Sequence, residues 1–304
     1  MPDLGDSLYL LNAGETYYQG ADRYSSNPKD FYDLVRTLLP SSWNLMRESI
    51  WMHCSRPEIR SVLPVQGWKI HLSVRSDRAC DLLQRVVPEL AARDTPFKFA
   101  LDKRILYLLN SKYWGRGGSG KFVTIYPLTD HAFVELADCL SALTEGMEGP
   151  YILSDRRYRG SKVVFYRYGG FQQLTRFDSA GGHINHIIAP DGQWVEDIRH
   201  PYFQVPEWLT DPYAESDPPE NDSEADSTLQ SGRFRIDDVL QFTNAGGVYV
   251  GVDTLDGRKI LIKEARPFVY AFGTESYATD MLAREHEMLS RLADLDVEIG
   301  RAHV

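Results

Sequence analysis

The chain has 304 residues, of which 43% are hydrophobic and 25% charged, so it is long enough for one large domain or two smaller ones, and a wholly disordered protein is excluded. Its 33 Lys and Arg stand against 43 Asp and Glu, which gives a net charge of −10. A general nucleic-acid-binding or anionic-membrane surface is therefore not expected.

Three helices are predicted in the first part of the chain from apolar residues at helical spacing. The first follows Pro28 and stops at Pro40, the second covers about 77–87, and the third begins after Thr129 as N-cap. Alternating polar and apolar residues predict strands at 68–74, 97–99, 121–126 and 162–167. These patterns favour an α+β domain with an antiparallel or mixed sheet, one face of which is covered while the other is available for a site.

A linker is predicted at 211–232, which is rich in Pro, Ser, Asp and Glu and has almost no large apolar side chain. It supplies seven acids and no Lys or Arg between Asp211 and Ser231. The linker would divide a domain at 1–210 from a segment at 233–304. Within that segment, residues 234–292 are expected to form a strand, a glycine turn, a strand and an amphipathic helix.

The compartment is predicted from the cysteines and from the absence of targeting signals. Cys54, Cys80 and Cys139 are widely spaced without a CxxC motif, which favours reduced thiols over disulfides or a thiolate metal site. No signal peptide and no apolar stretch of membrane-spanning length occurs, so a cytoplasmic protein is expected. The histidine pair His183 and His186 has no nearby Cys and is expected in a polar loop or sheet edge, so no metal site is predicted.

One strand face is unusually rich in cations. Lys69 and His71 share a face because residues two apart in a strand point to the same side, and Lys98 faces away from Phe97 and Phe99. Between Gln66 and Gly170 there are 16 Lys and Arg against 11 Asp and Glu, an excess of +5 in an acidic protein. Such local charge suits a phosphate-bearing substrate, although each pattern alone is more often a solvated surface.

Several motifs together resemble the phosphothreonine lyase family. They are Trp68-Lys-Ile-His-Leu-Ser-Val74, Phe97-Lys-Phe99, Gly115-Arg116 ahead of Phe122-Val-Thr-Ile-Tyr126, and Arg159 ahead of Arg167-Tyr-Gly-Gly170. With Asp197-Ile-Arg199, Pro206-Glu-Trp208, Asn244-Ala-Gly-Gly-Val-Tyr249 and Lys263-Glu-Ala-Arg-Pro267, nearly the whole chain is similar to the N-terminal part of a class III lanthipeptide synthetase, which joins lyase, kinase and cyclase domains.

The resemblance implies a phosphothreonine-lyase-like fold and a set of site residues. Lys98 would be the general base, His71 the general acid and Tyr126 a further site residue. The phosphate ligands would be Lys69, Arg116, Arg159 and Arg167, with Lys121 a further candidate and Arg157 a possible substitute for Arg159. The reaction would eliminate phosphate from phosphoserine or phosphothreonine in a ribosomal precursor peptide, giving dehydroalanine or dehydrobutyrine without a cofactor.

This chemistry requires that the pKa values of the lysine and the histidine move in opposite directions. A free lysine has a pKa of about 10.4 and is protonated at pH 7, and lowering that pKa to about 7 takes roughly 4 to 5 kcal/mol. Apolar flanks such as Phe97 and Phe99, with nearby arginines, are expected to supply it. A bound phosphate dianion would instead raise the pKa of His71 and keep it protonated.

Residues 233–304 resemble the start of a protein-kinase small lobe, in which Lys263 would contact nucleotide phosphates and Glu285 would pair with it. No HRD or DFG motif follows, so kinase activity is not expected, and ATP and Mg²⁺ would be needed only if the kinase domain were complete. The expected partners are the phosphorylated precursor peptide with its leader and the remaining kinase and cyclase domains of a longer chain. Two alternatives are a non-catalytic phosphopeptide or leader-binding module and a Ser/Thr kinase completed by missing chain.

Overall fold

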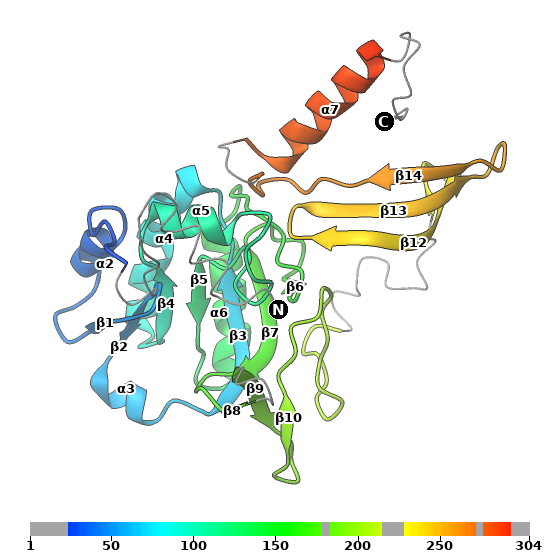
Figure 1. The fold of residues 1–304 in the computed structure, drawn as a ribbon. Helices are drawn as coiled ribbons and strands as arrows, with labels where there is room; N and C mark the ends of the chain where they lie inside the picture. Colours follow the sequence, from blue (N-terminus) through cyan, green and yellow to red (C-terminus); the bar gives the residue numbers. More distant parts are fainter. Residues whose placement is uncertain (1–23, 178–182, 215–227, 272–275, 293–304) are drawn as a thin grey trace. The chain divides into compact units, whose positions relative to one another are not determined.

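The computed structural model describes residues 24–177, 183–214, 228–271 and 276–292 (Figure 1). Its internal contacts divide the chain into two compact units. The first comprises residues 1–110 and 114–217, and the second comprises residues 111–113 and 218–304. Each unit is described by itself.

The first unit is built on a seven-stranded sheet in the order β1-β2-β4-β5-β3-β7-β6, in which every neighbouring pair is antiparallel. Its strands are β1 (Asn44–Glu48), β2 (Trp51–Ser55), β3 (Gln66–Leu72), β4 (Phe97–Ala100), β5 (Val123–Ile125), β6 (Arg156–Arg157) and β7 (Val164–Gly170). The predicted α+β class with an antiparallel sheet is confirmed.

Helices cover the apolar face of this sheet. They are α2 (Tyr32–Leu38), α4 (Ala79–Ala92), α5 (Lys103–Leu109) and α6 (Asp130–Leu143), whereas α3 (Pro57–Ser61) and the 3-10 turn η2 (Ser76–Arg78) have no buried residue. Trp68 of β3 stacks on Phe133 of α6, with ring centroids 5.7 Å apart. The predicted N-cap Thr129 accepts a hydrogen bond from the Ala132 N–H at 3.1 Å. Burial of this face leaves the opposite face to carry the polar residues of the alternating strands.

Helix α4 extends beyond the predicted 77–87 range, through Pro88 to Ala92. Pro88 is exposed, whereas Leu90 is completely buried with Val86 and Val87. Burial of these apolar side chains therefore stabilises the helical conformation on both sides of Pro88, although proline has no backbone N–H to donate.

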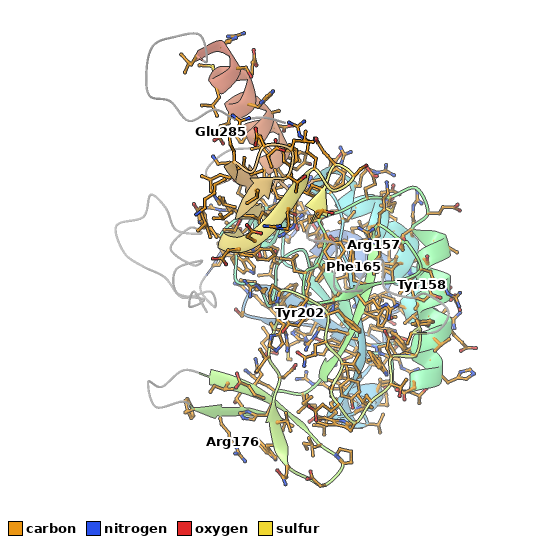
Figure 2. All side chains as sticks on the ribbon, turned by 90° about the vertical axis from the view of Figure 1, so that its right-hand side faces the viewer. Arg157, Tyr158, Phe165, Arg176, Tyr202 and Glu285 are labelled. Carbon is orange, nitrogen blue, oxygen red and sulfur yellow. The ribbon has the colours of Figure 1, made fainter. Side chains whose placement is uncertain are left out.

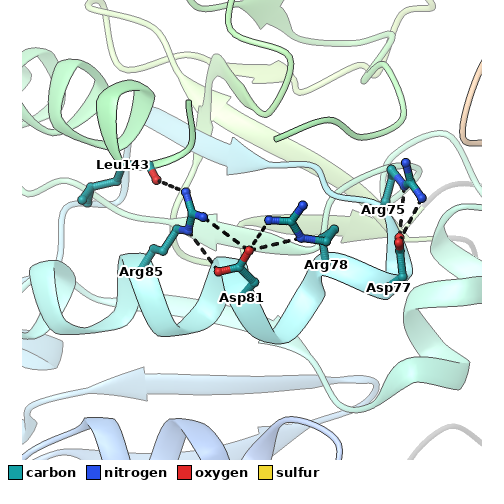
Figure 3. A network of polar contacts seen from close by, with 6 residues as sticks. All are labelled: Arg75, Asp77, Arg78, Asp81, Arg85 and Leu143. Carbon is teal, nitrogen blue, oxygen red and sulfur yellow. Dashed lines mark hydrogen bonds and ion pairs between the residues drawn. The ribbon is translucent and has the colours of Figure 1, made fainter. Parts of the chain in front are cut away.

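Much of the cationic excess at the start of α4 is neutralised locally (Figure 3). The Asp81 carboxylate accepts hydrogen bonds from the guanidinium groups of Arg78 and Arg85, while Arg75 pairs with Asp77 at 2.9 Å. Arg85 also donates to the Leu143 carbonyl at 3.2 Å, which connects α4 to the end of α6. These arginines therefore belong to the helix surface and contribute nothing to a substrate site.

A small three-stranded antiparallel sheet lies beside the large one. It contains β8 (Thr175–Phe177), β9 (His183–Ile188) and β10 (Trp194–Glu196), in the order β10-β9-β8. The Gln66 side chain connects β3 to β9, because its amide donates to the Ile188 carbonyl at 2.7 Å and accepts from the Ile188 N–H at 2.6 Å. The predicted loop or edge at residues 183–186 is thus the central strand of this sheet.

The first unit continues past residue 210, where the sequence predicts the linker to begin. Asp211 accepts hydrogen bonds from Arg156 and from the Tyr166 hydroxyl, and Tyr213 is 3% exposed among aromatic rings. An acidic stretch of this composition is expected to be solvated, but its first acid is paired with Arg156, whose side chain is 12% exposed. The middle of the predicted linker, residues 215–227, lies outside the described residues.

The second unit contains a four-stranded antiparallel sheet and one helix. Its elements are β11 (Thr228–Leu229), β12 (Phe234–Thr243), β13 (Gly246–Asp253), β14 (Lys259–Lys263) and α7 (Ala278–Leu292). The predicted turn falls at Asn244 and Ala245, and Gly246 begins β13 with φ 145°. A Cβ at Gly246 would lie 1.8 Å from the Glu264 carbonyl oxygen, so the close approach of β14 requires glycine. None of the helices described is long and apolar enough to cross a membrane.

Candidate active site

The polar face of the large sheet brings Lys98 and His71 into one row. Thr124 of β5 pairs with Lys98 of β4 on one side and with His71 of β3 on the other. Directly paired residues project to the same face, so all three side chains point the same way. A lysine and an imidazole two strands apart, about 10 Å between backbones, are close enough to contact one substrate residue between them.

These side chains line a small cavity of about 100 Å³. Its lining consists of Trp51, Lys69, His71, Lys98, Gly117, Gly118, Lys121, Thr124, Tyr126, Arg167 and Arg199. Six of the ten residues predicted for function are therefore brought together: Lys69, His71, Lys98, Lys121, Tyr126 and Arg167.

Lys98 has an environment that favours its neutral form. Burial and the nearby Arg199 lower its pKa to about 8, against the opposing effect of Glu48. Its Nζ lies 4.6 Å from the centroid of the Trp51 ring. The apolar cover comes from this indole, because Phe97 and Phe99 point into the core on the opposite face of the sheet.

His71 is held from one side by a buried carboxylate. Its Nδ1 shares a hydrogen bond with Asp155, whose side chain is completely buried. Burial and the nearby Lys121 lower the pKa of His71 to about 3, although Asp155 acts in the opposite direction. The imidazole is therefore neutral at pH 7, and its Nε2 is the ring nitrogen left for the cavity.

Lys121 contacts the same carboxylate. Its Nζ lies 3.1 Å from Asp155 Oδ1 and 3.2 Å from the Ser154 hydroxyl, which in turn donates to Asp155 at 2.8 Å. Burial lowers the pKa of Lys121 to about 8. The charge of Lys121 and the hydrogen bond with His71 keep the pKa of Asp155 well below its usual range. Asp155 thus positions both His71 and Lys121.

A second buried carboxylate, Asp197, holds two arginines. Arg167 Nη2 lies 2.7 Å from Asp197 Oδ1, and Arg199 pairs with the same oxygen. The two guanidinium groups hold the pKa of Asp197 below its ordinary value. Lys69, which pairs with Arg167 across β3 and β7, is buried, and desolvation places its pKa well below the usual range. One carboxylate cannot neutralise this group, so the cavity keeps a positive character.

Tyr126 closes one side of the cavity. Its ring lies 5.9 Å from Lys69 Nζ and packs edge-on against Phe171, with ring centroids 5.3 Å apart. Burial raises the pKa of its hydroxyl, so the phenol stays protonated and serves as a hydrogen-bond donor.

Two predicted phosphate ligands are not among the lining residues. Arg159 is half exposed on the surface and pairs with Asp138 at 2.7 Å. Arg116 precedes Gly117 and Gly118, which line the cavity, without lining it itself. The substitute Arg157 lies over the rings of Tyr151 and Phe165, at 5.1 and 5.9 Å from their centroids (Figure 2).

Five residues of the site were not predicted from the sequence: Trp51, Thr124, Asp155, Asp197 and Arg199. Asp155 stands in an arginine-rich turn, a composition typical of the protein surface, and Trp51 belongs to a strand pair that the periodicity did not predict. The one available signal was Asp197-Ile-Arg199, where opposite charges two residues apart suggest side chains directed to the same side.

A family model described as the N-terminal domain of RamC matches residues 31–225. The chain belongs to the RamC N-terminal domain family. A probable SapB synthase of Streptomyces coelicolor is 35% identical over 296 residues, which is 94% of this chain and 31% of the relative. The chain thus spans about a third of its relative's length. These findings confirm the resemblance to the N-terminal part of a lanthipeptide synthetase.

Solved phosphothreonine lyases share a more distant likeness with this RamC-type domain. The VirA (SpvC) effector of Chromobacterium violaceum is 18% identical and has a TM-score of 0.36, covering 53% of this chain and 82% of its own. The type III effector OspF of Shigella flexneri is also 18% identical, with a TM-score of 0.34 and coverage of 53% and 87%.

In the second unit of the RamC-type chain, Lys263 of β14 forms an ion pair with Glu285 of α7. This joins the two residues that the sequence predicts as a kinase-like pair. Both residues also line a cavity of about 520 Å³ between the strands and α7 of this unit. Both side chains are more than 40% exposed, so the pair stabilises the unit little by itself.

The buried lysines predict an unusual dependence of stability on pH. Between pH 8 and 10 the unfolded chain binds more protons than the native chain, because the pKa values of Lys98 and Lys121 are lowered to about 8 only in the native state. These two lysines are therefore expected to raise the free energy of unfolding with pH in this range, by at most about 3 kcal/mol for the buried Lys121, against the opposite contribution of the Cys54 thiol, whose pKa is raised by burial. Urea unfolding at pH 8, 9 and 10 measures the rise. Lys98→Met should reduce the slope, and an equal slope in both proteins would contradict a neutral amine at this position.

Proposed function

We propose that this chain eliminates phosphate from phosphoserine or phosphothreonine in a ribosomally made precursor peptide, giving dehydroalanine or dehydrobutyrine during lanthipeptide biosynthesis. The observation that carries the proposal is the Lys98 amine with its lowered pKa, in one cavity with His71 and a cluster of cations. Elimination needs a base for a weakly acidic Cα proton, stabilisation of developing negative charge and an acid for the leaving oxygen.

Lys98 supplies the base. With a pKa of about 8, roughly a tenth of the amine is neutral at pH 7, against a few in ten thousand for an ordinary lysine. The neutral Nζ removes the Cα proton, and the electrons of that bond form the Cα=Cβ double bond. The Cβ–O bond breaks, and phosphate leaves with its electron pair.

Cationic side chains receive the phosphate. Of the described residues that line the cavity, five are Lys or Arg: Lys69, Lys98, Lys121, Arg167 and Arg199. Two carboxylates contact this group, Asp155 and Asp197, so they offset only part of its positive charge and the remainder attracts a phosphate dianion. Asp197 fixes the guanidinium groups of Arg167 and Arg199 before substrate arrives, which lowers the ordering cost of binding.

His71 acts as the acid once phosphate is present. Its pKa of about 3 belongs to the cavity without substrate, and a dianion beside Nε2 raises that pKa because it favours the imidazolium. The protonated Nε2 then gives its proton to the leaving oxygen, so the phosphate departs as the hydrogen phosphate dianion. Asp155 keeps Nδ1 engaged and thereby directs Nε2 to the substrate.

Family membership supports a peptide substrate. The matched relative is named a probable SapB synthase, and this chain covers 31% of it. We propose that the remaining kinase and cyclase domains of a longer chain act on the same precursor, and that the second unit, with its Lys263–Glu285 pair, contributes to a kinase small lobe that binds ATP and Mg²⁺ only when completed.

The direct test is incubation with a peptide that contains phosphoserine, in EDTA, followed by mass spectrometry. Loss of the elements of phosphoric acid, with a product that adds a thiol, supports the lyase. Unchanged mass together with binding supports a phosphopeptide-binding module instead. A product that retains a hydroxyl indicates phosphatase chemistry and contradicts the proposal.

Asp155→Asn tests the positioning role of that carboxylate. The amide keeps the size of the side chain but removes the charge that favours protonated His71, so the pKa of the imidazole in the phosphate complex falls. We expect kcat to decrease by about 10²-fold while KM stays within a fewfold. A positioning role also predicts that the alkaline limb of the kcat–pH profile moves to lower pH. A uniform loss of activity at every pH would contradict it.

A further inference from the structure

The outer edge of the small sheet is open and apolar. Among the described residues no strand pairs with β10 on the side away from β9. All three residues of β10 are exposed, and Trp194 and Val195 are 39% and 38% exposed. Trp194 is flanked by Arg176, whose guanidinium carbon lies 4.6 Å from the indole centroid (Figure 2). An exposed apolar strand edge is a template for pairing with another chain.

The backbone pairing shows which groups this edge presents. The Asp197 N–H donates to the Asn185 carbonyl at 2.8 Å, and the Ala189 N–H donates to the Gln193 carbonyl at 2.8 Å. Residues 193, 195 and 197 therefore direct their backbone groups to β9. Because the direction alternates along an antiparallel strand, Trp194 and Glu196 direct their N–H and C=O groups outward.

This edge leads directly into the cavity. The residue after β10 is Asp197, which holds Arg167 and Arg199, and Arg199 lines the cavity three residues beyond Glu196. Three residues span at most about 10 Å, so a chain along β10 passes within one or two residues of the cavity. The Gln66 amide, with its two hydrogen bonds to Ile188, holds the small sheet in this place.

The size of the cavity identifies the occupant of the edge. A volume of about 100 Å³ admits one phosphorylated side chain and leaves the rest of a peptide outside. We propose that the outer edge of β10 binds the substrate peptide as an added strand, with hydrogen bonds to the backbone of Trp194 and Glu196, and so places the phosphorylated residue over the cavity. The inference rests on the proposed function for the identity of the peptide. Pairing through backbone groups tolerates different side chains in the peptide.

Peptide binding is measured separately from phosphate elimination, so that a failure of the strand-addition proposal can be distinguished from a failure of the lyase proposal. The probe is a fluorescein-labelled peptide of about ten residues, the upper length of a common strand, with a central phosphoserine, and its affinity is read by anisotropy. Trp194→Pro removes an outward N–H, whereas Trp194→Ala removes only the side chain. We expect Trp194→Pro to weaken binding about tenfold more than Trp194→Ala, the equivalent of one hydrogen bond. Thr175→Pro is the matched control on the opposite edge of the sheet and should change affinity less than twofold.

A scan of backbone N-methylation along the same peptide gives the second measurement. Strand addition predicts that affinity falls at every second position, because alternate N–H groups face β10. N-acetyl-phosphoserine methylamide, which fills only the cavity, should bind wild type and Trp194→Pro equally.

Equal binding of the long peptide by the Trp194→Pro and Trp194→Ala variants, or an N-methyl scan without the two-residue period, would overturn the inference. So would wild type forming a dimer that Trp194→Pro dissolves in sedimentation, because the edge would then be occupied by a second copy. Peptide binding with the expected pattern but without elimination supports the edge while the lyase proposal fails.

Discussion

Lys98→Ala is expected to lower kcat for phosphate elimination by about 10³-fold, within the range that a general base contributes. Its Nζ, with a pKa lowered to about 8, is the group proposed to remove the Cα proton. Binding of the phosphorylated peptide should stay within about tenfold of wild type, because the base acts on carbon and four other lining cations remain for the phosphate. Elimination is followed by mass spectrometry and binding by anisotropy.

The pH dependence of the elimination rate distinguishes a role of Lys98 as the base from a role as a positive charge only. In wild type, kcat at saturating peptide should rise with pH as the Lys98 amine loses its proton, since the neutral amine is the active form and the bound phosphate keeps His71 protonated. Lys98→Arg keeps the charge but not the ability to lose a proton, so it should be as inactive as Lys98→Ala. A wild-type rate in either variant would show that the base lies elsewhere.

Arg199→Ala is expected to weaken binding of the phosphorylated peptide by about 100-fold and to lower kcat/KM at least as much. The loss of one partner from a desolvated, hydrogen-bonded charge pair costs about 2 to 5 kcal/mol. The Arg199 side chain is 13% exposed, lines the cavity and is paired with Asp197. Its removal therefore takes a fixed positive charge away from the proposed phosphate position. Arg167→Ala should behave similarly, because it shares that carboxylate.

Arg159→Ala is the matched control, because it removes the same guanidinium from a surface position paired with Asp138. It should leave KM and kcat within twofold of wild type. An unphosphorylated peptide should bind wild type and Arg199→Ala equally, since only the phosphate requires the arginine. The reverse order, with Arg159→Ala defective and Arg199→Ala active, would restore the assignment made from the sequence pattern.

Local pattern predicted the elements whose apolar faces are buried. Trp68, Ile70 and Leu72 alternate with polar residues in β3, and the apolar stripe of α6 follows an N-cap threonine. The two-residue period of the strand and the 3.6-residue period of the helix can therefore be recognised in the sequence. Strand β2 and helix α5 were not predicted. Trp51–Ser55 follows β1 after only two residues and shows no clean polar face, and Lys103–Leu109 is buried on most sides. Tertiary burial rather than local pattern stabilises such elements.

The candidate site was predicted in the part that lies on strands. Lys69, His71 and Lys98 were placed on the correct face because a strand fixes side-chain direction every second residue. The carboxylates that hold His71 and Arg167, Asp155 and Asp197, lie outside the strands and were not predicted. Arg159 has φ 39° and turns to the surface, whereas Asp155, four residues before it, is buried against His71. Turns between strands have no such repeat, so the spacing of residues in a turn does not predict which way their side chains point.

The sequence alone determined the alternation that puts basic residues on one sheet face and apolar residues on the other, because that depends only on the two-residue repeat of an extended chain. Tertiary structure decided which of those bases have carboxylate partners. Asp155 and Asp197 come from chain segments 84 and 30 residues away from the side chains they hold, His71 and Arg167. Burial and Coulomb forces set the pKa values of this group, and both depend on distances through space that only the folded chain establishes.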